Sequence, residues 1–268
     1  MKKEKILLII PAYNESEGIV DVVAQVTAYC QKSPYHIDYL VINDGSTDNE
    51  EALLLLHKIH HFELVQNLGI GGAVQTGYLY AQRKGYDIAV QFDGDGQHDI
   101  ESLPQLLAPI INGEADFTVG SRFVSDSVSD FKSSGARQLG IKILSVLIKW
   151  TSRIKIKAVT SGYRAGNKKV IDQFAERYPS KYPEPESYMH LFAKGIRVQE
   201  VGARMFERTT GESSINIKKA VGYMIDVSLS ILIAALLEKE QYDDAFTIAN
   251  YCDYFVCYFL WPNYSVSS

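Results

Sequence analysis

The sequence predicts an α/β fold with a mostly parallel central sheet, followed by a hydrophobic helical tail. Two observations carry this prediction: the first 120 residues alternate between strand-like and helix-like segments, and the pattern changes after residue 120. Such alternation is typical of a parallel sheet covered by helices. With 268 residues, 46% of them hydrophobic, the chain can bury a sizeable core.

The expected elements follow from hydrophobic runs and capping residues. Strands are expected at residues 6–10, 37–42, 62–65, 87–92 and 115–119. Helices are expected at residues 16–31, 48–56, 71–84, 136–150 and 187–194. Ser16 and Asp48 are the expected N-caps of the first two helices.

The C-terminal part divides from the rest at about residue 215. We expect residues 1–215 to form the main domain and residues 216–268 a hydrophobic helical tail. Residues 220–237 are just long enough to cross a bilayer of about 30 Å, although Asp226 in their middle third makes crossing costly. An interfacial helix, or one packed on a partner or a second copy, is an equal alternative. Residues 245–266 are rich in aromatic side chains without a clear period.

Charge and cysteine content limit the classes of function. A net charge of −5 argues against a nucleic-acid binder. Residues 132–169 nevertheless hold ten Lys or Arg and no Asp or Glu, a pattern of solvated faces and of contacts with phosphates or anionic lipids. Three cysteines form no disulfide framework, and the hydrophobic run at residues 6–10 is too short for a signal peptide. We therefore expect the catalytic part to reside in the cytoplasm.

Polar clusters follow three of the expected strands, at residues 13–15, 43–46 and 93–95. In parallel sheets, ligands bind beyond the carboxyl ends of the strands. Each cluster alone is also ordinary turn chemistry, but the three together indicate a binding site. The glycines at residues 69–72 fit neither the dinucleotide nor the P-loop spacing, so we interpret them as a tight turn near this site, or as a plain helix entry.

Asp93-Gly94-Asp95 is the sharpest local signal. Two carboxylates one residue apart at a strand end can converge on one hard cation, and Gly94 leaves room for close approach. Mg²⁺ or Mn²⁺ typically joins such carboxylates to substrate phosphates. His98 either completes the metal shell or contacts the diphosphate.

Seven motifs in a fixed order give the chain a resemblance to a known family. They are PAYNE (11–15), NDGSTD (43–48), NLGIGGAVQTG (67–77), QFDGDGQH (91–98), GSRF (120–123), SGYRA (161–165) and FERTTGESSI (206–215). The chain resembles the family 2 glycosyltransferases of the Rossmann-like GT-A fold, in the branch that acts on polyprenyl phosphates and includes dolichol-phosphate-mannose synthases. The resemblance covers about residues 5–215.

The resemblance implies roles for the matching positions on the donor side. Pro11, Ala12, Tyr13 and Glu15 match the loop that holds the base and ribose of a nucleotide-sugar, and Asp44 matches the carboxylate that hydrogen-bonds the base. The family usually has a second Asp where this chain has Asn43. Gly71 belongs to the glycine turn expected beside the donor, and Gly94 to the loop at its diphosphate. Asp93 and Asp95 match the ligands of the metal and the diphosphate.

On the acceptor side, the resemblance implies that Arg122, Arg164 and Arg208 neutralise donor or acceptor phosphates, a task suited to guanidinium groups. Glu186, or Glu184, lies where the family often places a carboxylate near the acceptor. It can serve as a base, orient the sugar or the arginines, or simply begin a helix.

The implied function is inverting, metal-dependent transfer of a hexose or N-acetylhexosamine from a UDP- or GDP-sugar to a polyprenyl phosphate, serving cell-envelope glycan synthesis. One alternative acceptor is a hydroxyl of a lipid-linked saccharide, with Glu186 or Glu184 as base. A minor alternative is an inactive nucleotide-binding scaffold subunit. The expected location is the cytoplasmic face of the membrane, with the membrane surface and either a small membrane protein or a second copy as partners.

Overall fold

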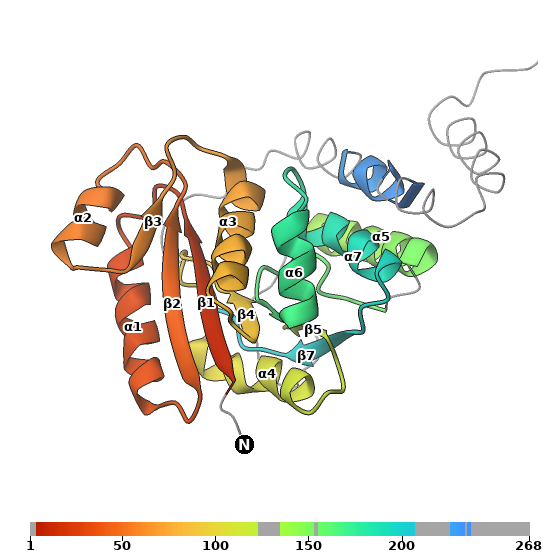
Figure 1. The fold of residues 1–268 in the computed structure, drawn as a ribbon. Coiled ribbons are helices and arrows are strands. Elements are labelled where there is room, and N and C mark those ends of the chain that lie inside the picture. The colour runs from red at the N-terminus through yellow and green to blue at the C-terminus, as the bar shows by residue number, and fades with distance from the viewer. Residues whose placement is uncertain (1–3, 123–134, 153–154, 207–225, 234, 237–268) are drawn as a thin grey trace, which may run out of the picture.

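The computed structural model describes residues 4–122, 135–152, 155–206, 226–233 and 235–236 (Figure 1). Its centre is a seven-stranded sheet with the order β3-β2-β1-β4-β6-β5-β7. The strands are β1 (Lys5–Ala12), β2 (His36–Asn43), β3 (His61–Glu63), β4 (Ile88–Gln91), β5 (Phe117–Ser121), β6 (Arg164–Asn167) and β7 (Val198–Gly202). Among these strands, β6 alone runs antiparallel to its neighbours, so the predicted mostly parallel sheet is confirmed.

Helices cover both faces of the sheet. They are α1 (Ile19–Lys32), α2 (Glu50–Leu56), α3 (Gly69–Arg83), the 3₁₀ turn η1 (Ile100–Ser102), α4 (Leu103–Ile111), α5 (Gly135–Ser152), α6 (Lys168–Glu176) and α7 (Pro183–Ala193). One hydrophobic cluster joins α3, α5, α6 and α7 to one face, and a second joins α1, α2 and α4 to the other. The result is a three-layer α/β/α arrangement (Figure 1).

The sequence of β1 explains its central place. Leu7 and Ile9 point into the first cluster, whereas Ile6, Leu8 and Ile10 point into the second. All five are fully buried because both faces of the strand are covered by helices. Such a strand is specified by a continuous hydrophobic run, which is what residues 6–10 provide.

Several expected boundaries are wrong for identifiable reasons. Pro11 does not end the first strand, which continues to Ala12. Ser16 is not the N-cap of α1, because the helix begins at Ile19 after Gly18 and the backbone N–H of Ser16 donates to Asp48. Asn49 rather than Asp48 occupies the N-cap of α2, although Asp48 accepts a hydrogen bond from Glu50 N.

A helix at residues 226–233 packs against α5 and α7 (Figure 1). Val227 and Ile231 are fully buried in the same cluster as Leu144 and Ile148 of α5. The Tyr182 hydroxyl donates to Asp226 over 3.2 Å. Within the described part of the chain, no helix has the length and hydrophobicity that crossing a membrane requires. Residues 237–268, including the aromatic stretch, lie outside the described residues.

Asp116, the residue before β5, links the ends of β5, β6 and β7 through hydrogen bonds. Its carboxylate accepts hydrogen bonds from the Arg197 side chain at 2.9 and 3.2 Å, from Arg197 N at 3.1 Å and from Asn167 at 2.9 Å. The side chains of Arg197 and Asn167 keep the pKa of the Asp116 carboxyl well below its usual value, against the opposing effect of burial.

We expect Asp116→Asn to lower the free energy of unfolding by about 1–3 kcal/mol at pH 7, because Arg197 and Asn167 lose a buried, charged acceptor. A carboxyl with a lowered folded-state pKa stabilises the protein above its unfolded pKa of about 4. The difference between variant and wild type should therefore narrow as the pH falls below about 4. Urea unfolding at several pH values measures this difference in the free energy of unfolding. The control is Glu114→Gln, at an exposed residue. An equal difference at pH 3 and pH 7 would contradict the prediction.

Candidate functional site

The polar clusters predicted to form a site lie together at one edge of the sheet. Strands β1, β2, β4 and β5 point the same way, and the register pairs Ala12 with Asn43 and Ile9 with Gln91. The loop after β4 reaches the end of β1, since a Cβ built on Gly94 would lie 3.1 Å from Pro11 O. A side chain at this position would press on the backbone of Pro11, so Gly94 favours the close approach. The three loops form one continuous surface.

Reciprocal hydrogen bonds tie the loop after β1 to the loop after β2. Asn14 N donates to Ser46 Oγ at 3.0 Å, and Asn14 Oδ1 accepts from Thr47 N at 2.8 Å. Asn14 adopts a left-handed backbone conformation with φ of 56°, which Asn tolerates better than most residues. Asn14 thus acts as the bridge between the loops.

Glu50, the first residue of α2, adds a further hydrogen bond between the same two segments. Its Oε2 atom accepts a 2.7 Å hydrogen bond from Glu15 N, while Asp48 Oδ2 accepts one from Ser16 N at 3.2 Å. Glu50 is fully buried, and its Oε1 atom has no hydrogen-bond partner among the described residues. Burial raises the pKa of this carboxyl. The sequence analysis gave Glu50 no role, because an acidic side chain in the first turn of a helix is common and usually exposed to solvent.

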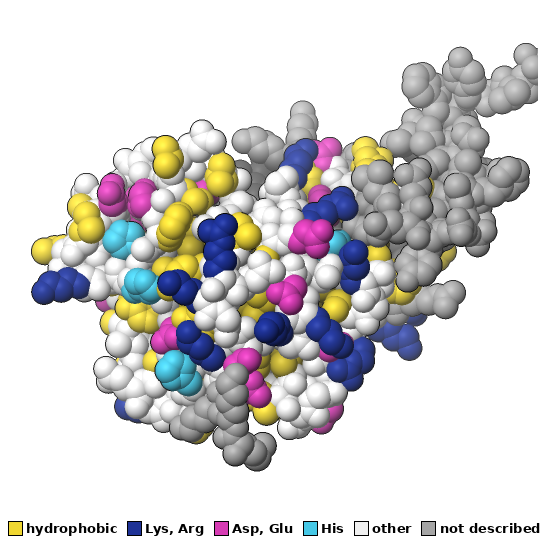
Figure 2. Space-filling model, viewed as in Figure 1, with side chains coloured by type: hydrophobic (Ala, Val, Ile, Leu, Met, Phe, Trp, Pro, Cys, Tyr) yellow, Lys and Arg dark blue, Asp and Glu magenta, His cyan; other side chains and the backbone are white. Residues whose placement is uncertain are grey.

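Asp44 connects the second loop to the start of α3. It is 3% exposed, and its Oδ1 atom accepts a 2.7 Å hydrogen bond from Leu68 N. Tyr13 is 44% exposed at the same edge. Figure 2 shows that exposed hydrophobic side chains gather over α2, β3 and the start of α3, beside this loop. They are Leu55, Leu56, Phe62, Val65, Leu68 and Ile70.

Gly71 lies in the first turn of α3, in agreement with the helix expected from residue 71, and the left-handed backbone of the glycine segment is at Gly69, which has φ of +76°. A Cβ built on Gly71 would lie 2.4 Å from Pro179 O, so the residue allows the helix to pack against the backbone of residues 179–180. Its role in the described structure is close packing.

Asp93 is held on both of its carboxylate oxygens. Oδ1 accepts from Gln91 Nε2 at 3.1 Å, and Oδ2 lies 2.9 Å from His98 Nε2. A Cβ built on Gly162 would lie 2.2 Å from Oδ2, so the carboxylate fills the space that this glycine leaves. Burial raises the pKa of Asp93, but His98, Gln91 and Arg164 outweigh it and leave the pKa below its usual value.

The metal shell predicted from Asp93, Asp95 and His98 is not assembled as a three-residue group. Among the described residues, no three His, Cys, Asp or Glu side chains converge in a way that could hold an ion. The His98 ring is 7% exposed and directs Nε2 at Asp93, so it fixes that carboxylate. Asp93 and Asp95 remain two partly exposed carboxylates at a strand end. Such a pair fits Mg²⁺ or Mn²⁺, which usually takes one or two carboxylates together with substrate phosphates.

The arginines predicted to contact phosphates occupy different environments. Arg122 follows β5 at the same sheet edge and is partly exposed. Arg164 is fully buried, donates to Ser161 O at 2.6 Å and Ser187 Oγ at 2.8 Å, and lies over the Tyr188 ring. Its guanidinium therefore faces the protein interior instead of an open surface. Arg208 lies outside the described residues.

The two glutamates of the first turn of α7 face different neighbours. Burial raises the pKa of Glu184, Arg164 lowers it, and Asp93 raises it further. Burial also raises the pKa of Glu186, but Ser230 and Lys181 are the groups that lower it. Glu184 is thus the glutamate that interacts electrostatically with Arg164 and Asp93, whereas Glu186, named first from the sequence, interacts with Ser230 and Lys181.

Gln91 is a site residue that sequence reasoning quoted without giving it a role. The available signal was a polar side chain at the end of a hydrophobic run, at residues 88–92. Such a residue must find hydrogen-bond partners once the strand is buried.

Comparison with known proteins agrees with this geometry. Polyprenol monophosphomannose synthase of Mycolicibacterium smegmatis is 30% identical over 231 residues, covering 81% of this chain and 84% of that protein. The UDP-N-acetylglucosamine–dolichyl-phosphate N-acetylglucosaminyltransferase of Methanococcus voltae is 31% identical over 215 residues, covering 72% and 82%.

The fold is shared with glucosyl-3-phosphoglycerate synthase from Mycobacterium tuberculosis. Its crystal structure with Mn²⁺, UDP-glucose and phosphoglyceric acid has a TM-score of 0.62 at 17% identity, covering 87% of this chain and 80% of that one. The model of glycosyl transferase family 2 matches residues 7–174. This match covers more than half of the sequence, and the chain therefore belongs to glycosyl transferase family 2.

Proposed function

We propose that the protein transfers a hexose or N-acetylhexosamine from a nucleotide-sugar to a polyprenyl phosphate at the cytoplasmic face of a membrane. The observation that carries this proposal is the meeting of two nucleotide loops with the Asp93–Asp95 pair at one sheet edge. The names of the relatives from M. smegmatis and M. voltae support the choice of a polyprenyl-type phosphate as acceptor.

The donor side follows from the connected loops. Pro11 and Ala12 at the end of β1, Tyr13, Glu15 and Asp44 would bind the base and ribose. The hydrogen bonds between the loops keep these groups in place before the donor arrives, which lowers the entropy lost on binding.

Asp93 and Asp95 would hold Mg²⁺ or Mn²⁺ against the donor diphosphate. When bound, the cation neutralises the negative charge that builds up on the departing nucleoside diphosphate. Gly94 allows the loop that carries both carboxylates to lie directly on the end of β1.

Transfer would be a single displacement. An oxygen of the acceptor phosphate attacks the anomeric carbon while the bond from that carbon to the donor diphosphate breaks, and the electron pair leaves with the nucleoside diphosphate. The configuration at the anomeric carbon inverts. Because the acceptor is already anionic, it requires no base, and Arg122 and Arg208 would position it.

Arg164 would act through its neighbours, since its guanidinium is enclosed. Its positive charge lies close enough to lower the pKa values of both Asp93 and Glu184. It would therefore offset part of the negative charge that the site concentrates.

One observation favours a hydroxyl acceptor as a second candidate. Glu184, in the first turn of α7, interacts electrostatically with Arg164 and Asp93 and has a pKa raised by burial, and a raised pKa suits a general base. In that case the acceptor would be a hydroxyl of a lipid-linked saccharide, with Glu184 taking the place first given to Glu186.

Membrane contact is assigned to α5. Ile143, Val146 and Trp150 are 50%, 66% and 59% exposed, and their spacing places them along one side of the helix. Lys142 and Lys149 are exposed beside them. Exposed hydrophobic side chains flanked by lysines are typical of helices that lie on anionic membranes. We keep residues 1–215 as the transferase domain and 216–268 as a C-terminal tail. Its helix at residues 226–233 packs on that domain, and the rest of the tail would contact the membrane, a small membrane protein or a second copy.

The function is tested with purified full-length protein, Mn²⁺, and a panel of labelled UDP- and GDP-sugars offered to either a polyprenyl phosphate or a lipid-linked saccharide. We expect an acid-labile phosphodiester on the polyprenyl phosphate. Asp95→Asn should lower the rate on the order of 10²-fold, because a ligand for the charge-neutralising cation is lost. Labelling of saccharide hydroxyls alone would instead support the second candidate.

Glu50→Ala should weaken binding of the nucleoside diphosphate about 10-fold while leaving kcat little changed, because Glu15 N loses its acceptor and the loop loosens. Glu50→Gln keeps an acceptor oxygen and should restore most of the affinity. Isothermal titration calorimetry measures the affinity of both variants for the nucleoside diphosphate. The control is Glu51→Ala, at the adjacent exposed residue. Equal affinities of Glu50→Ala and wild type would show that this contact does not position the loop.

Replacing Val146 and Trp150 with Ser should lower binding to vesicles that contain anionic lipids by about 10-fold or more, because buried hydrophobic area is lost from the contact. The control is Leu56→Ser, which removes a side chain that is 72% exposed on α2. Cosedimentation measures the bound fraction. If the variant with Ser at positions 146 and 150 binds these vesicles as well as wild type does, α5 is not the contact surface.

A further inference from the structure

A chain of hydrogen bonds runs from the hydrophobic core to Asp93. The Tyr178 hydroxyl donates to Gln91 Oε1 at 3.3 Å, and Gln91 Nε2 donates to Asp93 Oδ1 at 3.1 Å. Gln91 is 1% exposed and Tyr178 is 7% exposed, so neither group competes with bulk water for these contacts.

The Gln91 amide gives this chain of hydrogen bonds a direction. An amide has one accepting end and one donating end, and a tyrosine hydroxyl directed at the oxygen leaves the nitrogen directed at the carboxylate. With the amide reversed, its oxygen would face the carboxylate of Asp93 and the two would repel. Burial raises the pKa of Tyr178 well above its usual value, so the hydroxyl keeps its proton. The Asp93 carboxylate and the donating hydroxyl of Tyr178 therefore together set which end of Gln91 faces Asp93.

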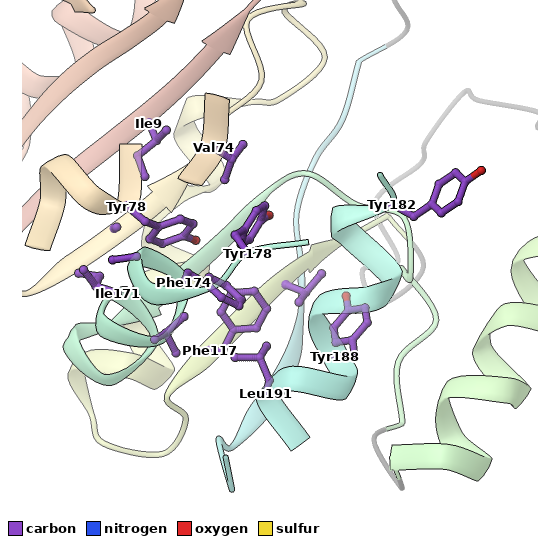
Figure 3. Packing of buried hydrophobic residues seen from close by; sticks show 14 of the residues in the cluster. Ile9, Val74, Tyr78, Phe117, Ile171, Phe174, Tyr178, Tyr182, Tyr188 and Leu191 are labelled. Carbon is purple, nitrogen blue, oxygen red and sulfur yellow. The ribbon is translucent and has the colours of Figure 1, made fainter. Parts of the chain in front are cut away.

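The position of Tyr178 is itself fixed by packing. Its ring lies 4.8 Å from Phe174 and 5.8 Å from Tyr78, measured between centroids. Figure 3 shows Tyr78 of α3 and Tyr178, which follows α6, side by side in the cluster that also contains Phe174. The two tyrosines differ in one respect: the Tyr78 hydroxyl is buried without a hydrogen-bond partner among the described residues.

Asp93 is also confined on its other side. Oδ2 lies 2.9 Å from His98 Nε2 and occupies the space over Gly162. Rotation of the carboxylate therefore requires both the His98 and the Gln91 contacts to break. The side chain is still 30% exposed, which leaves it accessible to a ligand.

We propose that Tyr178 and Gln91 are positioning residues that hold the Asp93 carboxylate in the orientation needed to bind a divalent cation with a nucleoside diphosphate. The proposal rests on the metal-binding role given above to Asp93. Neither residue contacts the substrate in this scheme. Partners that orient a metal-binding carboxylate typically change metal affinity by 10–100-fold when removed.

The test compares two variants that each remove one buried hydroxyl from the same cluster, Tyr178→Phe and Tyr78→Phe. The readout is the dissociation constant of Mn²⁺ in the presence of UDP or GDP, from the electron paramagnetic resonance signal of free Mn²⁺. We expect Tyr178→Phe to weaken Mn²⁺ binding about 10-fold and Tyr78→Phe to change it less than 2-fold. The thermal midpoint of Tyr78→Phe should be equal to or above that of wild type, because an unpaired buried hydroxyl is lost.

Gln91→Leu provides a second measurement, because it removes both hydrogen bonds while keeping the volume close to that of the amide. It should weaken Mn²⁺ binding at least as much as Tyr178→Phe, with nucleotide affinity in the absence of metal unchanged. Wild-type Mn²⁺ affinity in Tyr178→Phe, or an equal loss in Tyr78→Phe, overturns the positioning role while leaving the proposed function intact. If wild-type protein binds no Mn²⁺ in the presence of either nucleotide, both the proposed metal site and the proposed positioning role are wrong.

Discussion

The parallel pairing of β1 with β2 and β4 is the constraint on which the site depends. Each residue of β1 from Ile6 to Ile10 is fully buried, so a shift of register by one residue would send every side chain to the wrong face. The same register sets where the strands end. It thereby brings the loops after Ala12, Asn43 and Gln91 to one edge, although Ala12 and Gln91 are 79 positions apart in the sequence.

The edge concentrates charge that the fold must stabilise. Glu50, Asp44 and Arg164 are almost or fully buried. Glu50 and Asp44 accept hydrogen bonds from backbone N–H groups of other segments, and Arg164 donates to the Ser187 side chain on α7. A buried charged group is costly unless such bonds accompany it. These residues therefore connect segments as well as carry charge, and this explains how loops without regular secondary structure can hold a defined arrangement.

The sequence was sufficient to predict what depends on local pattern. The hydrophobic run at residues 6–10, the motifs at strand ends and the mostly parallel sheet are local or topological signals, and the structure contains the strands and the sheet they predict. The inward direction of Arg164 depends on which face of β6 is covered, and the choice between Glu184 and Glu186 depends on which face of α7 meets which neighbour. Two glutamates two residues apart on a helix lie about 200° apart around its axis, and only the tertiary structure shows which one faces the site.

The enclosed position of Arg164 bears on the kind of acceptor that the edge can accept. Arg164 is held in place by Ser161 and Ser187, and its positive charge lowers the pKa values of both Glu184 and Asp93. It thus offsets part of the negative charge at this edge, where Asp93 and Asp95 are the acids proposed to hold a cation. A divalent cation would neutralise that pair, and Arg122 follows β5 at the same edge. An anionic acceptor would then meet little excess negative charge, which is the electrostatic condition that a phosphate nucleophile requires.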